Sequence, residues 1–324
     1  MPNHPAYFSN TFLLAASTLT ILLLASACQK PHHLPPVPEG AEAISLLGDT
    51  LKPLDLPEET YQEYSENLEQ AVANYRLDPE DPDAIIWLGR RLAYLGHYRE
   101  AVQTFTEGIY KFPEDPRMYR HRGHRYITLR LFDQAIEDFE TAVSLMRNQP
   151  DEVEPDGLPN PYGEPRSTLH TNVWYHLGLA HYLKGQYYEA AEAFQRCVEA
   201  STNDDMLTAA LYWYYMAERR AGLDEQAGRL LDRVEPEMDI LENDTYHKLL
   251  LVFKGYFHPD KLLGEADEAL QNATAAYGVG NWHFINSREE EAFELWNNIL
   301  EGGHWPAFGY LAAEAELYKL KADS

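Results

Sequence analysis

Apolar residues recur along most of this chain at the spacing of amphipathic helices, and no segment alternates as a strand would. Within this periodicity one set of small and aromatic residues repeats three times: Gly89, Ala101 and Phe105; Gly123, Ala135 and Phe139; Gly178, Ala190 and Phe194. The interval from the glycine to the alanine and on to the phenylalanine is identical in every copy. Because small residues allow two antiparallel helices to approach closely, each copy predicts a helical hairpin.

The third copy has the fullest pattern: Trp174, Leu177, Gly178, Gly185, Tyr187, Ala190 and Phe194. This spacing resembles the tetratricopeptide repeat, a helix–turn–helix unit of about 34 residues, and the step from Gly89 to Gly123 equals one such unit. The resemblance implies an all-α fold, a right-handed α-solenoid of stacked helix–turn–helix repeats. An ordinary amphipathic bundle is the alternative, but three equal glycine-to-alanine intervals favour the repeat. Arg122 stands where Leu88 and Leu177 stand in the other copies, so its charge must be paired or directed to water.

The repeats divide the chain into units. We expect a solenoid over residues 58–324, opening with a partial or capping helix over 58–77 and closing with a helix over 307–319 that is apolar on one face and acidic on the other. The expected repeats are 82–115, 116–147, 171–204, a weaker one at 208–241, and 273–306. A proline-rich insertion over 148–170 separates the second and third repeats, and such insertions often lie on the binding face.

The N-terminal segment predicts export. Residues 12–27 are apolar and uncharged, too short to span a bilayer, and they read as part of a signal peptide over residues 1–27. The sequence Leu24-Ala25-Ser26-Ala27-Cys28 resembles the lipobox of bacterial lipoproteins, which implies lipidation of Cys28. A cleaved signal with an incidental cysteine and an uncleaved anchor are the alternatives. Gln29 then implies the outer membrane, and residues 28–57 predict a proline-rich tether.

Composition limits the partners. The chain has 52 acidic and 26 basic residues and a net charge of −26, which argues against nonspecific binding to nucleic acid or to an anionic membrane surface. An acidic surface is also typical of adaptation to high salt. If Cys28 is lipidated, Cys197 has no intramolecular disulfide partner, and its place in the repeat predicts a small core residue.

Catalytic and metal-binding patterns are missing from the sequence. His121 and His124 share a helix face, but no third ligand has metal-site spacing. No nucleophile elbow, paired zinc histidines, phosphate loop or dinucleotide fingerprint occurs. We therefore expect no enzyme activity, no cofactor and no metal.

The rare basic residues concentrate in one place: residues 117–130 contain five arginines, two histidines and no acid. The resemblance implies that the first helix of each repeat lines a concave groove through its second, fifth and ninth positions. Those positions give a cationic part, followed by an aromatic to apolar part. The candidate binding residues are Arg90, Arg117, Arg120, His124, Tyr175 and Tyr212. The alternative is that the arginines are neutralised by acids on adjacent helices: Glu107, Asp133, Glu137 or Asp138.

Three functions compete. The leading hypothesis is a noncatalytic, lipid-anchored scaffold that binds a partner protein or extended peptide in its groove, with a preference for an acidic or carboxylate-bearing segment. The second is glycan capture by an outer-membrane nutrient-uptake lipoprotein, through the aromatic residues Trp174, Tyr175, Tyr212 and Trp213. The third is an enzyme with a site in residues 242–290, where Tyr277, Trp282 and His283 cluster in the sequence.

Overall fold

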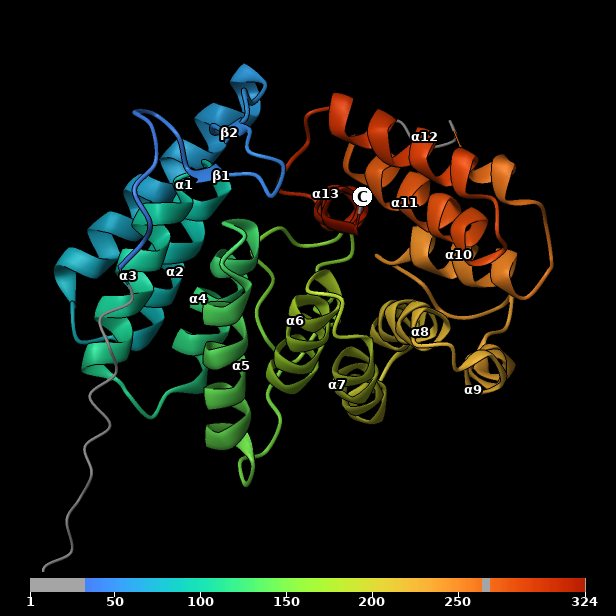
Figure 1. Cartoon of the computed structure of the whole chain (residues 1–324). Helices are drawn as coiled ribbons and strands as arrows, with labels where there is room; N and C mark the ends of the chain where they lie inside the picture. The colour runs from blue at the N-terminus through green and yellow to red at the C-terminus, as the bar shows by residue number, and fades with distance from the viewer. Residues whose placement is uncertain (1–32, 264–268, 324) are drawn as a thin grey trace, which may run out of the picture. The chain divides into compact units, whose positions relative to one another are not determined.

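The computed structural model describes residues 33–263 and 269–323, and these are almost entirely helical. Consecutive helices pack as antiparallel hairpins that stack side by side (Figure 1). The fold is therefore an all-α array of helix–turn–helix repeats, as the sequence predicts. Its α-helices are α1 (Glu58–Leu77), α2 (Pro82–Tyr94), α3 (Tyr98–Lys111), α4 (Pro116–Thr128), α5 (Phe132–Met146), α6 (Leu169–Leu183), α7 (Tyr187–Ala200), α8 (Asp204–Arg220), α9 (Asp224–Leu230), α10 (Asp244–Phe253), α11 (Ala269–Ile285), α12 (Glu289–Glu301) and α13 (Phe308–Asp323). Two short 3-10 segments, Leu231–Arg233 and Pro259–Leu262, flank α10.

Local sequence sets the helix starts. The side chain of Asp81 caps α2 and that of Asp115 caps α4, and each aspartate is followed by a proline at the first helical position. Thr168 caps α6 through a reciprocal capping box with Thr171. These caps fix where α2, α4 and α6 begin.

Each repeat glycine leaves room for a phenylalanine ring from the second helix of the same repeat. A Cβ atom added to Gly89 would overlap the Phe105 ring, one added to Gly123 would lie 2.9 Å from Phe139, and one added to Gly178 would lie 2.8 Å from Phe194. From the spacing alone, Gly89, Gly123 and Gly178 are expected to face the alanines Ala101, Ala135 and Ala190 of the same repeats. The structure corrects this pairing: the phenylalanine ring farther along the second helix fills the space between the two helices. Gly280 and Trp296 repeat this contact in the last unit, at 2.7 Å.

The turn between the two helices requires a positive φ angle. Gly96, Gly185 and Gly222 supply it in three repeats, with φ between 77° and 81°. In the second repeat this position is occupied by Arg130, with φ 64°. Such a positive φ angle is energetically unfavourable for any residue other than glycine. Arg130 is buried, so a tertiary contact of its side chain must hold it there.

Arg122 is paired within the core. Its guanidinium donates two hydrogen bonds to Asp138, at 2.8 and 2.7 Å, and a third to the Thr106 hydroxyl at 3.1 Å. Burial alone would lower the pKa of Arg122, but the hydrogen bonds and charge of Asp138 reverse that effect and raise it. Of the two outcomes expected for this charge, pairing and not exposure is the observed one.

The segment before α1 requires a correction. Strands β1 (Ala43–Ile44) and β2 (Thr50–Leu51) form an antiparallel pair, although the sequence showed no strand pattern. Ala43 and Leu51 are buried in the core, and the Trp305 indole donates a hydrogen bond of 2.7 Å to the carbonyl of Lys52. Residues 41–54 are therefore packed structure, not tether. Cys28 lies outside the described residues.

Two further observations concern Cys197 and the apolar character of the helices. Cys197 is fully buried, and burial raises the pKa of its thiol to about 12, which fits a core residue. Across residues 33–263 and 269–323, no helix combines the length and the apolar character that crossing a bilayer requires.

Candidate functional site

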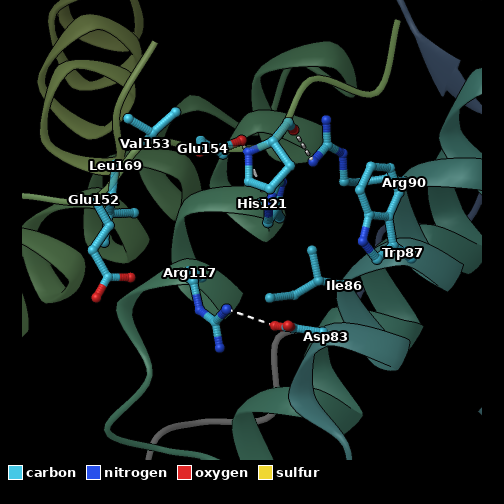
Figure 2. A pocket seen from close by; sticks show the side chains of 11 residues that line it. Asp83, Ile86, Trp87, Arg90, Arg117, His121, Glu152, Val153, Glu154 and Leu169 are labelled. Carbon is cyan, nitrogen blue, oxygen red and sulfur yellow. Dashed lines mark hydrogen bonds and ion pairs between the residues drawn. The ribbon is translucent and has the colours of Figure 1, made fainter. Parts of the chain in front are cut away.

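The first helices of the first two repeats bring the predicted cationic residues together. We call the residues Asp83, Ile86 and Arg90 of α2 and Arg117, Arg120 and His124 of α4 the charged half of the groove face. Arg90 and Arg117 line a cavity of about 200 Å³ with Trp87 and residues of the insertion (Figure 2). Arg90 also lines a second cavity of about 110 Å³, together with Arg120 and His124. The structure thus brings together residues of α2 and α4 along two neighbouring cavities.

The charge of Arg117 is neutralised by two carboxylates of the preceding repeat. It forms hydrogen bonds with the Asp115 carboxylate at 2.6 to 3.1 Å and an ion pair with Asp83 of α2 at 2.6 Å. The hydrogen bonds to Asp115 are the largest influence on Arg117 and raise its pKa. Arg117 thus braces α2 against α4, which corrects its assignment as a free cationic contact.

Arg120 is paired with an acid from the insertion. It is buried and forms an ion pair with Glu154 at 3.0 Å, and Asn172 of α6 donates a hydrogen bond of 3.1 Å to the same carboxylate. Burial lowers the pKa of Arg120, and the nearby Arg90 adds to that effect, whereas Glu154 opposes it. The carboxylate that neutralises Arg120 is therefore none of the four acids proposed from the sequence, because it belongs to the insertion.

The insertion follows the charged half as an extended chain. Arg90 donates a hydrogen bond of 2.8 Å to the carbonyl of Pro155, and Arg91 donates one of 3.1 Å to the carbonyl of Gly157. Figure 2 shows Val153 and Glu154 opposite Arg90 and Trp87 of α2. The Arg90 guanidinium stacks 4.4 Å from the Trp87 ring centroid. Two arginines therefore contact the main chain of the insertion, and one contacts its acidic side chain.

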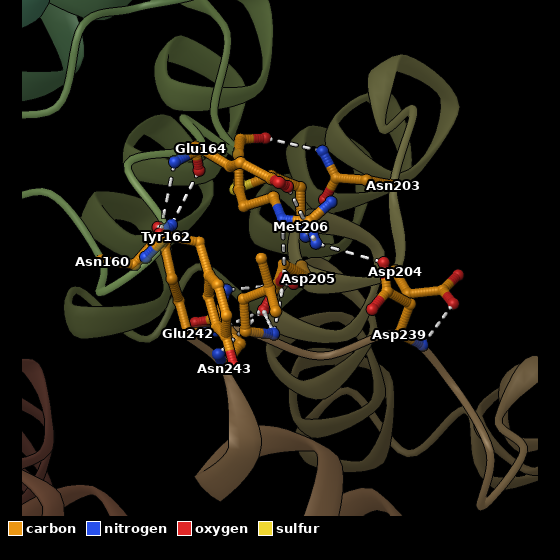
Figure 3. A network of polar contacts seen from close by, with 12 residues as sticks. Asn160, Tyr162, Glu164, Asn203, Asp204, Asp205, Met206, Asp239, Glu242 and Asn243 are labelled. Carbon is orange, nitrogen blue, oxygen red and sulfur yellow. Dashed lines mark hydrogen bonds and ion pairs between the residues drawn. The ribbon is translucent and has the colours of Figure 1, made fainter.

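A second anchor holds the other end of the insertion (Figure 3). The buried Asp205 of α8 accepts hydrogen bonds from the backbone N–H groups of Leu241, Glu242 and Asn243, at 2.8 to 3.1 Å. Arg166 of the insertion lies 3.4 Å from Asp205 and 3.1 Å from Asp239. This network fixes residues 160–166 to the fourth repeat independently of the contacts at 152–157.

Three histidines lie beside this face: His121 and His176 are buried and His124 is half-buried. Burial lowers the pKa values of His121, His124 and His176 well below 6.5, and neighbouring arginines add to the effect. The rings of His124 and His176 lie 4.3 Å apart. Among the described residues no group of three or more His, Cys, Asp or Glu side chains could hold a metal ion.

The predicted aromatic half is covered. This half comprises Asn172, Tyr175 and Leu179 of α6 and Ala209, Tyr212 and Met216 of α8, and all six residues are buried. The Tyr175 hydroxyl bonds with that of Tyr246 at 3.2 Å and accepts a hydrogen bond from Trp213 at 2.8 Å. Tyr212 packs against Tyr246 of α10 and is fully buried. Tyr175 and Tyr212 are core residues in this structure, which corrects their assignment to a ligand surface.

The C-terminal helix completes that cover. Phe308 at the start of α13 lies 5.5 Å from the His124 ring and 6.3 Å from the Tyr175 ring. Further along α13, the buried carboxylate of Glu314 forms an ion pair with the guanidinium of Arg130, 2.5 Å away. The closing helix therefore packs into the repeats with Glu314 and Glu316 buried, so the expected separation into an apolar and an acidic face is wrong.

The residues of the two other functional hypotheses are also largely buried. For glycan stacking, Trp213 is 1% exposed and Tyr212 is fully buried. For the proposed enzyme cluster, the Tyr277 hydroxyl bonds with the Tyr182 hydroxyl at 2.7 Å, and both side chains are in the core. The contact of the insertion with the basic residues was not predicted from the sequence. The acidic run of the insertion, Asp151 to Asp156, has the charge opposite to residues 117–130, and that was a usable signal.

Comparison with known proteins agrees with this architecture. Residues 171–204 match a family model described as tetratricopeptide repeat, and residues 88–153 match a second model of the same description. The repeats are of the tetratricopeptide type. Human Tetratricopeptide repeat protein 13 is 36% identical over 74 residues, which make up 23% of this chain and 8% of that protein. This chain thus matches only a small part of that relative.

Two solved structures have a similar arrangement of helices. A tetratricopeptide repeat protein from Parabacteroides merdae has 16% identity and a TM-score of 0.46, over 80% of this chain and 99% of that one. YrrB, a tetratricopeptide repeat protein with an unusual peptide-binding site, has 17% identity and a TM-score of 0.42, over 74% of this chain and 96% of that one. Repeats of this type generally serve as noncatalytic scaffolds for protein–protein interaction.

Proposed function

We propose that this protein is a noncatalytic adaptor that binds an extended, acidic segment of a partner protein on the charged half of the groove face. The observation that carries the proposal is the insertion itself. Residues 152–158 form an acidic, non-helical segment, and Arg90 and Arg120 of the charged half, together with the adjacent Arg91, already bind it. A surface that holds such a segment within the chain has the chemistry to hold a similar segment from a partner.

The contacts support recognition of an extended chain in general. Arg90 and Arg91 donate to main-chain carbonyls, which every peptide offers, whereas Arg120 selects a carboxylate. The rest of the protein carries a large negative charge, so an acidic partner is repelled elsewhere and attracted here. The partner segment competes with the insertion and binds only those molecules in which the insertion has left the face. The apparent affinity for the partner is therefore its intrinsic affinity multiplied by that fraction of molecules.

We also propose that the adaptor is held at the bacterial cell envelope, in the outer membrane, by a lipid on Cys28. The sequence Leu24 to Cys28 supports this proposal, and so does the apolar run that precedes it. Mass spectrometry of the native protein tests it: we expect the mature chain to start at a lipid-modified Cys28. The Cys28→Ser variant should lose its detergent requirement or keep its leader. An unmodified Cys28 in the mature protein would contradict the anchor.

The binding proposal is tested with a fluorescently labelled nonapeptide of residues 151–159, Asp-Glu-Val-Glu-Pro-Asp-Gly-Leu-Pro, and the full chain. The Glu154→Gln variant loses the charge with which the insertion binds Arg120, so it should bind the peptide more tightly than the wild type in fluorescence anisotropy. Adding Arg120→Ala to that variant should weaken binding about tenfold or more. Arg196→Ala is the matched control, because Arg196 is exposed and pairs only with Glu199 among the described residues.

A peptide whose fourth residue is glutamine separates recognition from folding, because it leaves the protein unchanged. It should bind the Glu154→Gln chain more weakly than the acidic peptide does. Equal affinity of the two peptides would contradict recognition of the carboxylate by this face.

A further inference from the structure

A third cavity borders the charged half of the groove face. It has a volume of about 400 Å³ and forms where segments distant in sequence meet: the N-terminal segment, the turn after α2, the tip of the insertion and the loop before α13. Figure 1 shows the loop between α12 and α13 close to the N-terminal hairpin, and the Trp305 hydrogen bond to Lys52 joins them. Its apolar lining includes Leu54, Leu56, Leu158, Pro306 and Ala307.

Arg125 of α4 brings a single full charge to this lining, which contains no Asp or Glu among the described residues. The other arginines of the interior each have a carboxylate: Arg122 has Asp138, Arg130 has Glu314 and Arg220 has Glu316. No ion pair or hydrogen bond reaches the Arg125 guanidinium from residues 33–263 or 269–323. Its contact is the Tyr98 ring, whose centroid lies 5.7 Å away.

The surroundings of Arg125 leave a surplus of positive charge. The neighbouring cavity of about 110 Å³ shares Ala93, Tyr94 and Arg125 with this one. It is lined by the guanidinium groups of Arg90, Arg120 and Arg125, but by one carboxylate, that of Glu154. Burial lowers the pKa of Arg125 to about 10, and repulsion from Arg120 contributes. At neutral pH the group is still charged, so an anion in the cavity would balance it.

We propose that this cavity binds a small amphipathic carboxylate, of the chemical class of a medium-chain fatty acid, with its carboxylate on Arg125 and its hydrocarbon against Leu54, Leu56 and Leu158. Pockets for small ligands have this composition, an apolar wall with a few polar groups that fix orientation. Leu158 lines the cavity and is 55% exposed, so the cavity has access to solvent at the insertion. This site does not rest on the proposed adaptor function.

The test is isothermal titration calorimetry of the full chain with decanoate and with decanol, at concentrations where both are monomeric. We expect one decanoate to bind per chain, and decanol to bind about tenfold or more weakly, because it has the same chain without the charge. Arg125→Met should reduce decanoate affinity by a similar factor. Arg196→Met is the matched control and should bind as the wild type does.

The proposal is overturned if decanol binds as tightly as decanoate, or if folded Arg125→Met binds decanoate unchanged. Because Arg125 is half buried, its variant could fail to fold. Leu158→Glu then decides, since Leu158 is exposed enough for the fold to tolerate the change, which circular dichroism checks. A glutamate there places a negative charge at the cavity, so decanoate affinity should fall about tenfold or more. An unchanged affinity would overturn the site.

Discussion

The two halves of the groove face are both covered by the chain itself, but through different chemistry. Over α2 and α4, residues 152–158 are held by an ion pair and by arginine hydrogen bonds to main-chain carbonyls. Backbone hydrogen bonds also join Glu152 to Leu169 and Glu154 to Ser167. Over α6 and α8, the cover is made of packed rings from α10 and α13. Helix α13 is fixed in turn by its buried Glu314, which binds Arg130 in the turn between α4 and α5. Polar contacts of the first kind can be exchanged for water or for another peptide, whereas the second kind is part of the core.

This difference teaches where a partner can bind. Displacing residues 152–158 exposes mainly arginines and one tryptophan that water or a peptide can accommodate. Displacing α13 would expose Tyr175 and leave Arg130 without its carboxylate. The charged half is therefore the exchangeable part of the groove, and four predictions test that conclusion.

The largest effect is expected when the cover of the aromatic half is broken. Glu314→Ala leaves the buried guanidinium of Arg130 without a carboxylate, so it should lower the free energy of unfolding by about 3–5 kcal/mol. Thermal or urea unfolding followed by circular dichroism measures the loss. Glu237→Ala is the control, since Glu237 is exposed, and it should be near neutral. A Glu314→Ala protein as stable as the control would mean that α13 is not fixed by this pair.

Acid should destabilise the boundary between the two halves. The folded-state pKa values of His121, His124 and His176 lie well below 6.5, so the unfolded chain binds protons that the folded chain does not. Stability is therefore full above pH 6.5 and is lost as the pH falls, by up to about 1.4 kcal/mol per histidine for each pH unit. Denaturation midpoints between pH 7.5 and 5.5 measure this.

A single substitution checks the source of the acid effect. His176→Phe keeps a ring in the same buried space but removes one titrating group, so its stability should depend less steeply on pH. The same slope in this variant and in the wild type would contradict a contribution from His176.

The repeat packing common to both halves gives a smaller effect. In Gly178→Leu the new side chain meets the Phe194 ring, so overpacking should cost about 1–3 kcal/mol. Gly228→Leu is the matched control, because nothing lies within 4 Å of a Cβ atom added at that exposed helical glycine. The melting temperature of Gly178→Leu should fall well below that of the control. Similar melting temperatures would show that the two helices do not pack as described.

The smallest effect on stability should come from the charged half. Glu154→Gln keeps the shape of the side chain and removes one charge from a cluster that also contains Asn172 and Arg90, so we expect a loss of about 1 kcal/mol or less. Amide hydrogen exchange of residues 152–158 should nevertheless become faster. If this variant were as destabilised as Glu314→Ala, the two halves would not differ and the insertion would be part of the core.

The sequence was sufficient for the helical repeats, although it did not predict the strand pair β1–β2. The periodicity of apolar residues predicts the helices, and the recurring glycine, alanine and phenylalanine predict the hairpins and their type. The same spacing assigned Arg90, Arg117 and Arg120 to one face, because positions three and seven residues apart on a helix share a side. Cys197 was also predicted as a core residue from its place in the repeat.

Only the tertiary structure decided what covers those residues. The whole of α5 separates Glu154 from Arg120 along the chain, Glu314 lies 184 residues after Arg130, and Tyr246 lies 71 residues after Tyr175. The sequence spacing of a repeat constrains neighbouring helices, but it contains no information on which distant segment folds back over them. Whether an arginine or a tyrosine on the groove face meets a partner or its own chain depends on that long-range packing. For this reason the motif spacing assigns residues to a face but does not show which of them the chain itself covers.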